Sequence, residues 1–270
     1  MTRRFQSRRQ SPRRQPISSE PILATEDVAP EPADCPRCQK PVAFCVCSVL
    51  AHVANRLMVV ILQHPQEQDK TLGTARLTQL QLQRSILKVG LSWPNLKTLL
   101  NRRTVDMKRW AVLHPGSAEQ MNSILAEFSE PPEIMVLDRS GTPASTGESN
   151  AALRGLEGII LLDGNWQQAK TLWWRNPWLL KAWRIALFPR FRSAYGALRR
   201  EPRRQSVSTL EAAALCLAHL EKQPALFTAL VQPLEHLVKA VSAPKRTAKI
   251  VQLTDALDSA DLADSVNASE

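Results

Sequence analysis

The sequence predicts an α/β fold with a mostly parallel sheet and helices on both of its faces. Short, mostly apolar runs alternate along the chain with longer segments of helical periodicity, which is typical of parallel strands joined by helical crossovers. One run, Ile159–Leu162, is apolar at every position, as expected of a strand covered on both faces. The length of 270 residues suffices for one main domain with flanking tails.

Four segments are expected along the chain. Residues 1–33, rich in Arg, Ser, Gln and Pro, are predicted to be a disordered basic arm. A cysteine knuckle over 34–50, a main domain over 51–240 and a flexible acidic tail over 241–270 follow. Within the main domain the patterns predict strands at Leu57–Leu62, Trp110–Leu113, Ile134–Leu137, Ile159–Leu162 and Trp183–Leu187, and helices at Thr71–Lys88, Ala118–Phe128, Gln167–Arg175, Thr209–Glu221 and Pro224–Ala240. The Gly-, Thr- and Ser-rich segment Ser140–Leu153 is predicted to be an exposed loop.

The cysteines indicate a metal site. Cys35, Cys38, Cys45 and Cys47 lie within 13 residues, and clustered thiols in a reducing compartment more often bind metal than form disulfides. Four thiolates suit a closed, structural zinc site; redox cysteines and an iron–sulfur cluster are the alternatives. Cys216 falls on the apolar side of a predicted helix and is expected to be an inert core residue.

The strand over 159–162 ends in an acid that points to a ligand site. Asp163 and Gly164 follow the strand, and Trp166 begins the next helical segment. Ligands of open α/β sheets bind at the carboxyl ends of strands, where these side chains would lie. The alternative is that Asp163 only caps the following helix.

A basic segment, Arg184–Arg204, holds seven arginines against the single acid Glu201. Guanidinium groups neutralise phosphates and the interleaved aromatic rings can stack on bases, although such a run is ordinarily a solvated face. Pro189 and Pro202 interrupt any helix, which favours a structured basic loop. The net charge of +10 and pI near 9.8 agree with a polyanionic partner.

Two further clusters accompany strand or helix ends. Ser208 or Thr209 can cap a helix with Glu211 as its capping-box partner, and the backbone N–H groups of such a helix start can hold a carboxylate or a ribose oxygen. His64 and the polar residues after it directly follow the first predicted strand.

The sequence lacks the motifs that mark several common functional classes. The chain has no dinucleotide fingerprint, phosphate loop or nucleophile elbow. It has no apolar run of transmembrane length and no signal-peptide core, so we expect a cytoplasmic protein that does not bind membranes.

Five blocks occur in one order along the chain: Cys35-Pro-Arg-Cys38 with Cys45-Val-Cys47, His64-Pro-Gln-Glu67 through Lys70 to Thr74-Ala-Arg-Leu77, Leu113-His-Pro-Gly116, Leu162-Asp-Gly-Asn-Trp-Gln-Gln-Ala-Lys170, and Ser208-Thr-Leu-Glu-Ala212. Together they resemble the DTW-domain family, named for an Asp-x-Thr-Trp motif, and within it the bacterial tRNA-uridine aminocarboxypropyltransferases. Two positions depart from the pattern, because the motif threonine is Asn165 here and the arginine of a His-Pro-Arg-Glu block is Gln66.

The resemblance implies a fold related to the SPOUT methyltransferases, with a knotted C-terminal part. It implies transfer of the 3-amino-3-carboxypropyl group of S-adenosylmethionine to N3 of a tRNA uridine, in the variable loop, with release of 5′-methylthioadenosine. The alternatives are an S-adenosylmethionine-dependent RNA methyltransferase and a zinc-knuckle RNA-binding protein without catalysis.

The residues themselves supply a mechanism that is consistent with this reaction. Asp163 is expected to take the N3 proton as general base, and Trp166 to stack on uracil or line the cofactor pocket. Cofactor contacts are expected from Leu113, Pro115, Gly116, Leu162, Gly164, Asn165, Ser208, Thr209 and Glu211. RNA contacts are expected from His64, Glu67, Lys70, Lys170, Arg192, Tyr195, Arg199 and Arg200.

Overall fold

A six-stranded sheet forms the centre of the computed structural model, which describes residues 34–113, 118–128, 130–198 and 207–243. Its strands lie in the order β2-β1-β5-β3-β6-β4. They are β1 (Met58–Gln63), β2 (Ser85–Val89), β3 (Trp110–Leu113), β4 (Ile134–Leu137), β5 (Gly158–Asp163) and β6 (Trp183–Leu187). Every neighbouring pair is parallel except β4 with β6, so the predicted mostly parallel sheet is confirmed.

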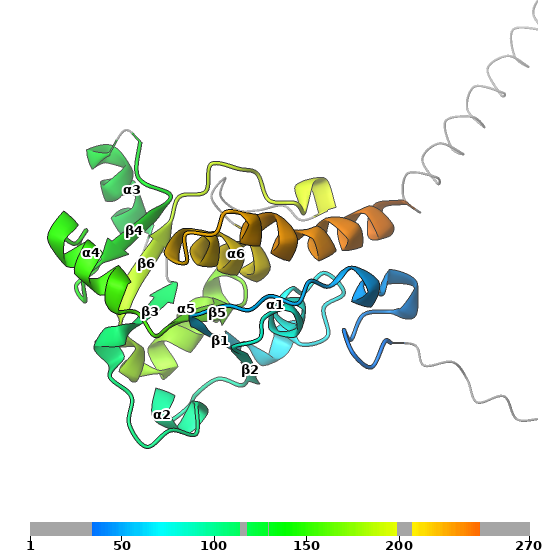
Figure 1. The fold of residues 1–270 in the computed structure, drawn as a ribbon, viewed down its shortest axis with the longest axis horizontal. Helices are drawn as coiled ribbons and strands as arrows, with labels where there is room; N and C mark the ends of the chain where they lie inside the picture. The colour runs from blue at the N-terminus through cyan, green and yellow to red at the C-terminus, as the bar shows by residue number, and fades with distance from the viewer. Residues whose placement is uncertain (1–33, 114–117, 129, 199–206, 244–270) are drawn as a thin grey trace, which may run out of the picture. The chain divides into compact units, whose positions relative to one another are not determined.

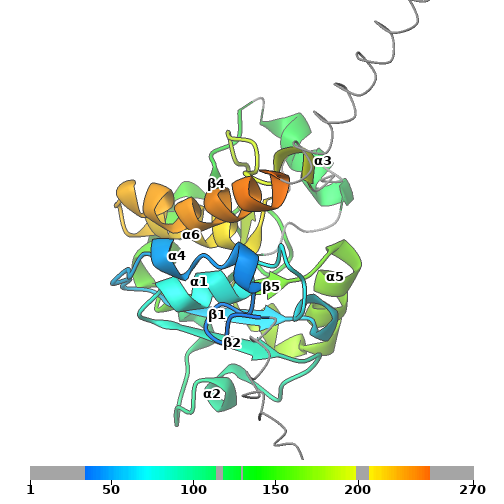
Figure 2. The ribbon, with the colours of Figure 1, turned by 90° about the vertical axis from the view of Figure 1, so that its right-hand side faces the viewer.

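Helices cover both faces of this sheet (Figures 1 and 2). They are α1 (Ala75–Gln81), α2 (Leu96–Leu99), α3 (Ala118–Glu127), α4 (Thr146–Gly155), α5 (Trp166–Arg175) and α6 (Thr209–Leu220). A further helix runs over 225–243.

Successive side chains of the central strands point to opposite faces of the sheet and so contribute to two separate hydrophobic cores. Ile61, Ile159 and Leu161 point to the face that α6 and the helix over 225–243 cover. Val60 and Ile160 point to the opposite face, where α2 and α5 pack. Because β1, β3 and β5 are buried on both faces, their sequences are continuously apolar rather than alternating.

Two predicted elements differ from the structure. The helix predicted over Thr71–Lys88 is two elements, α1 and the edge strand β2, whose residues pair with β1 in parallel register. The loop predicted over Ser140–Leu153 contains α4, which begins at a capping box formed by Ser145 and Glu148. Residues 85–89 form a strand because they pair with β1, against their helical pattern. Residues 146–155 form a helix because the capping box stabilises its start, against their loop-like composition.

Within the described residues, no helix combines the length and the apolar character needed to span a bilayer.

Candidate functional site

Asp163 lies at the carboxyl end of β5 with its carboxylate held on both sides. Oδ2 accepts a hydrogen bond of 2.9 Å from Nε2 of Gln63, the residue paired with Asp163 at the end of β1. Oδ1 accepts a hydrogen bond from the hydroxyl of Thr209, the first residue of α6. Only 7% of Asp163 is exposed, so this carboxylate is fixed in orientation by partners from two other elements.

The start of α5 shows that Asp163 is not a helix cap. Asn165 is the N-cap, and its side chain forms a capping box with Gln168. A Cβ atom on residue 164 would lie 2.7 Å from Cβ of Gln168, so the turn between strand and helix requires glycine. Asn165 therefore performs at the cap what the family threonine can also perform, and the Asp163 carboxylate takes no part in capping α5.

The start of α6 contacts Asp163 through Thr209. Ser208 is the N-cap and forms the predicted capping box with Glu211. The Glu211 carboxylate is 1% exposed and also accepts hydrogen bonds from the Ser193 hydroxyl at 2.9 Å and the Ala194 N–H at 2.7 Å. The structure therefore corrects the expected cofactor contact of Glu211, because its oxygens already hold the chain after β6 against α6.

The loop after β1 closes a third side of the site. The backbone N–H of His64 donates to the carbonyl of Asp163 at 3.0 Å, and Nε2 of Gln168 donates to Oε1 of Gln66 at 3.2 Å. Gln66, in place of the family arginine, thus joins this loop to α5. The Lys70 ammonium contacts the buried Glu67 carboxylate at 2.6 Å, so Glu67 does not face solvent as an RNA contact would.

The structure brings most of the expected cofactor residues to one edge of the sheet. Leu113 ends β3 beside β5, and Leu162, Gly164 and Asn165 flank Asp163 in sequence. Thr209 contacts Asp163 directly. Pro115 and Gly116 lie outside the described residues.

The expected RNA residues of α5 and the basic segment differ in their exposure. Lys170 and Arg192 are exposed, whereas Arg199 and Arg200 lie outside the described residues. Tyr195 is 1% exposed, and its hydroxyl donates to the carbonyl of Leu72 at 2.5 Å. The expectation that Tyr195 stacks on RNA is corrected accordingly, because a buried ring presents no face to a base.

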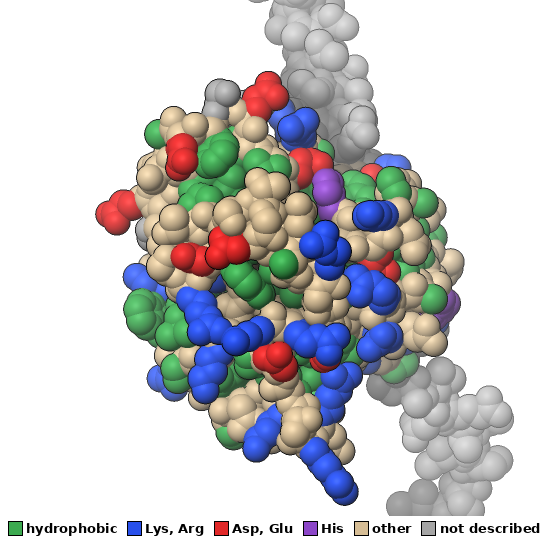
Figure 3. All heavy atoms as spheres, turned by 60° about the vertical axis from the view of Figure 1, so that its left-hand side comes forward, with side chains coloured by type: hydrophobic (Ala, Val, Ile, Leu, Met, Phe, Trp, Pro, Cys, Tyr) green, Lys and Arg blue, Asp and Glu red, His purple; other side chains and the backbone are tan. Residues whose placement is uncertain are grey.

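Positive charge is prominent on the surface. Lys and Arg side chains gather in a broad band across the face shown in Figure 3. Not every arginine of the basic segment contributes, because Arg184 turns inward: its guanidinium lies 4.9 Å from the centre of the Trp173 ring and donates to the carbonyl of Arg139 at 2.7 Å.

The four clustered cysteines form a compact group of thiols. All four Sγ atoms lie within 4.8 Å of one another, with 3.7 Å between those of Cys35 and Cys47 and 3.8 Å between those of Cys38 and Cys45. A tetrahedral zinc ion with bonds of about 2.3 Å to sulfur requires sulfur separations of about 3.8 Å. The backbone N–H groups of Cys38 and Arg37 lower the pKa of the Cys35 thiol to about 6, whereas burial raises the pKa of the Cys47 thiol to about 12. A bound metal would require all four thiols as thiolates. The thiols therefore fit a tetrahedral metal ion.

A buried lysine joins this cysteine knuckle to the site. Lys40 is 3% exposed, and its ammonium donates to the carbonyls of Lys70 at 2.9 Å and Gly73 at 2.6 Å. Burial lowers the pKa of Lys40 to about 8, against the attraction of Cys38, Asp163 and Asp34. Through these two hydrogen bonds of Lys40, the knuckle stabilises the loop after β1.

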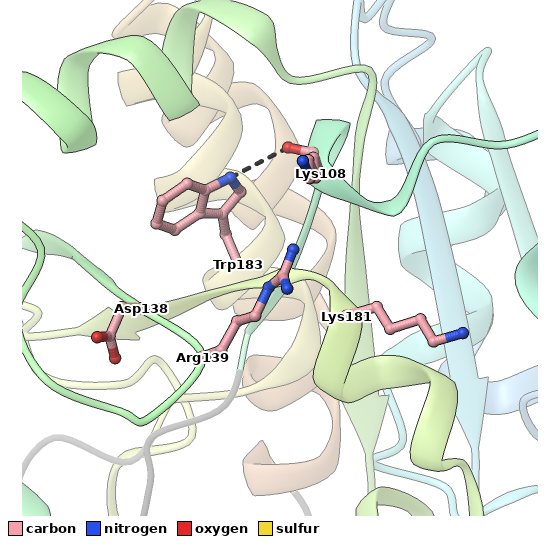
Figure 4. Close-up of a pocket in the computed structure, with 5 residues that line it drawn as sticks. All are labelled: Lys108, Asp138, Arg139, Lys181 and Trp183. Atoms are coloured by element: carbon pink, nitrogen blue, oxygen red, sulfur yellow. Dashed lines mark hydrogen bonds between the residues drawn. The ribbon is translucent and has the colours of Figure 1, made fainter.

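A separate cavity of about 410 Å³ lies at the opposite edge of the sheet, where β3 and β6 begin (Figure 4). Its lining includes an indole whose Nε1 donates to the carbonyl of Lys108 at 3.0 Å. The lining residues are Lys108, Asp138, Arg139, Lys181 and Trp183. Oδ1 of Asp138 accepts hydrogen bonds from the backbone N–H groups of Ser140, Gly141 and Thr142, which form the turn that follows this residue.

Comparison with known proteins bears on the strand-end site. The model of the DTW domain matches residues 32–242, a range that contains the cysteine knuckle, the loop after β1, Asp163 and α6. The chain belongs to the DTW-domain family. No solved structure matches this DTW-domain chain.

Several similar proteins carry one name. The chain is 31% identical over 210 residues to "tRNA-uridine aminocarboxypropyltransferase 2" of Drosophila melanogaster, a match that covers 76% of this chain and 73% of that protein. The proteins of the same name from Macaca fascicularis and Mus musculus are 30% and 29% identical, and each match covers 76% of this chain and 62% of the relative. These relatives are animal proteins, whereas the sequence motifs had indicated bacterial ones.

Sequence reasoning missed three residues that shape this DTW-domain site. Gln63 ends an apolar strand, Gln168 sits inside the first helical turn, and Lys40 follows the first cysteine pair. For Gln63 a signal was available: it is a single polar residue at the end of an otherwise apolar strand, where ligand sites of such sheets lie. Nothing local indicated the partners of Lys40.

Proposed function

We propose that this protein transfers the 3-amino-3-carboxypropyl group of S-adenosylmethionine to N3 of a uridine in the variable loop of a tRNA. The observation that carries the proposal is the fixed, nearly buried Asp163 carboxylate at the strand-end edge between α5 and α6. The names of the similar proteins support the same reaction.

The reaction requires one proton acceptor. N3 of uridine carries a hydrogen and attacks the γ-carbon of the methionine moiety as this proton leaves. The N–C bond forms while the C–S bond breaks, and sulfur keeps the bonding pair in 5′-methylthioadenosine. Asp163 accepts the proton, a step for which positioned carboxylates contribute about 10²–10⁴-fold in rate. Gln63 and Thr209 hold the carboxylate in one orientation, so it loses little freedom in the transition state.

The donor binds at the carboxyl ends of β3 and β5. Backbone groups of Leu113, Leu162 and Gly164 hold the adenosine, and Asn165, Ser208 and Thr209 place the starts of α5 and α6 beside it. The contacts expected from Pro115 and Gly116 lie outside the described residues. Helix starts favour negative charge, which suits the carboxylate of the transferred group. Trp166, which is 40% exposed, lines the opening and can stack on uracil.

We further propose a structural zinc ion bound by Cys35, Cys38, Cys45 and Cys47. The sulfur separations support it, and four thiolates leave no open position for catalysis. When bound, the ion neutralises thiolate charge and cross-links the knuckle. Through Lys40, the knuckle then stabilises the loop that contributes Gln66 to the site.

A SPOUT-like knot in the C-terminal part is likewise proposed. Its support is that the chain after β6 is held between distant segments, by the bond of Tyr195 to Leu72 and by the bonds of Ser193 and Ala194 to Glu211. The phosphates of tRNA would then meet the exposed cations Lys70, Lys170 and Arg192, together with the imidazole of His64. The further contacts expected from Arg199 and Arg200 lie outside the described residues.

The test is incubation of purified protein with tRNA and S-adenosylmethionine labelled either in the methyl or in the carboxypropyl part. We expect label from the carboxypropyl part in tRNA, and nucleoside mass spectrometry to show the modified uridine. Transfer of the methyl label alone would show an RNA methyltransferase, and transfer of neither label would leave RNA binding without catalysis.

A further inference from the structure

The helix that follows Asp163 presents two tryptophans to solvent. Trp166, at the start of α5, is 40% exposed, and Trp174, in its last turn, is 68% exposed. The side of α5 that faces the sheet is filled by Leu172 and Trp173, both buried. Trp174 therefore contributes little to the core. A single exposed apolar residue is ordinary on a protein surface, so Trp174 indicates a binding surface only through what lies around it.

The exposed residues of α5 form a row that begins at the site. Trp166, Lys170 and Trp174 are spaced by four residues, so they lie along one side of the helix. With a rise of about 1.5 Å per residue, the two tryptophans are about 12 Å apart along the axis. Lys170 is exposed between them. We call this row the α5 ridge; it lies on the face of the sheet away from α6 (Figure 2).

The segment that forms the ridge and follows it carries positive charge only. The sequence holds no Asp or Glu from Gly164 to Arg200. Among the described ion pairs, none involves Lys170, Arg175 or Lys181. Beyond the end of α5, Lys181 lines the cavity that also contains Lys108 and Arg139. Asp138, the one acid in that lining, accepts hydrogen bonds from its own turn, so cations predominate past the helix. Exposed indoles among unpaired cations complement a single-stranded nucleic acid, whose bases stack and whose phosphates are anionic.

We propose that the α5 ridge binds the unpaired nucleotides that flank the target uridine, with Trp174 stacking on a base and Lys170 neutralising a phosphate between that base and the site. The inference rests on the proposed function, because it requires that the base beside Asp163 belongs to an RNA. Stacking on an indole tolerates every base. The ridge therefore adds affinity and positions the RNA strand without selecting its sequence.

The test compares substitutions of Trp174 in the full-length protein. Trp174→Ala is expected to raise the Kd for tRNA by about 5- to 150-fold, the range for loss of one base–aromatic stack, and to leave the affinity for S-adenosylmethionine unchanged. Trp174→Phe keeps a stacking ring and should restore most of the affinity. Trp174→Leu keeps an apolar side chain without a ring and should resemble Ala.

A lysine pair tests the phosphate contact. Lys170→Ala should weaken tRNA binding and reduce the slope of log K against log salt by about one. Lys239→Ala, an exposed lysine on the helix over 225–243 on the opposite face of the sheet, is the matched control and should change neither.

Two results would overturn the inference: a Trp174→Ala protein whose Kd for tRNA stays within about twofold of the wild type, or equal binding by the Leu and Phe variants. If Trp174→Ala does not fold, the Leu and Phe pair still decides. The proposed function fails separately, when wild-type protein transfers no carboxypropyl label to tRNA, whatever the Trp174 variants bind.

Discussion

Replacement of Asp163 by Asn separates catalysis from structure at the strand-end site. The amide has nearly the shape of the carboxylate but cannot accept the N3 proton. In the native protein Oδ2 accepts from Gln63 and Oδ1 accepts from Thr209. After substitution the amide oxygen accepts from Gln63, while the new NH2 group donates to the Thr209 hydroxyl, which can act as either partner.

The expected cost in stability is small. Two hydrogen bonds to a charged group, worth about 1.5–3 kcal/mol each, become neutral ones worth about 0.5–1.5 kcal/mol. The loss is therefore about 2–3 kcal/mol, out of the 5–15 kcal/mol typical of a domain. The variant should remain folded at 25 °C, with a lower midpoint of urea unfolding.

The expected cost in rate is much larger. Loss of a general base should slow product formation by about 10²–10⁴-fold. Single-turnover transfer of carboxypropyl label to tRNA, at saturating protein and donor, measures this step without contributions from product release. Calorimetry of donor binding, expected to change little, verifies that the pocket is intact.

Near-normal single-turnover rates in Asp163→Asn would refute the reasoning and reduce Asp163 to a residue that positions the donor. Asn165→Thr is the matched control, because it restores the family motif two residues away. Thr caps a helix nearly as well as Asn, so this variant should keep both its stability and its rate.

The remaining predictions test the knuckle, the buried anchors and the basic segment. Cys35→Ser should abolish the binding of about one zinc equivalent per chain and lower the melting temperature; full metal retention would contradict the four-thiolate site. Tyr195→Phe should lower the free energy of unfolding by about 0.5–1.5 kcal/mol with tRNA affinity intact, and reduced affinity at unchanged stability would argue for an RNA contact instead. Glu211→Gln should destabilise by about 1–3 kcal/mol in urea, because a buried NH2 group would face N–H donors; donor affinity that falls without any loss of stability would restore Glu211 to the cofactor pocket. Joint neutralisation of Arg192, Arg199 and Arg200 should weaken tRNA binding and flatten its salt dependence, and an unchanged slope would show a merely solvated segment.

Elements whose signals are local could be predicted from the sequence. The continuous apolar run before Asp163 predicted a buried parallel strand, and β5 is that strand. Ser208 and Glu211 predicted a capping box at the start of α6, which the structure contains. The capping signal of Ser145 and Glu148 was equally present, but the Gly-, Thr- and Ser-rich composition around it favoured a loop.

Elements stabilised by distant partners could not be predicted in this way. Residues 85–89 follow α1 after a short connection and lie at the edge of the sheet. Their pairing with β1 determines their conformation. Strand propensity is a weak local signal because it reflects packing against neighbours. The predicted helix over 71–88 failed for this reason.

The sequence by itself determined the local chemistry of this protein: the spacing of four cysteines, the acid and tryptophan after a buried strand, and the excess of arginine. Only the tertiary structure decided how these residues are used. It joins Gln63 to Asp163 across 100 residues, turns Tyr195 inward and leaves Trp174 exposed. The physical reason is that the orientation of a side chain depends on what packs around it, and those neighbours come from elements far apart in the chain.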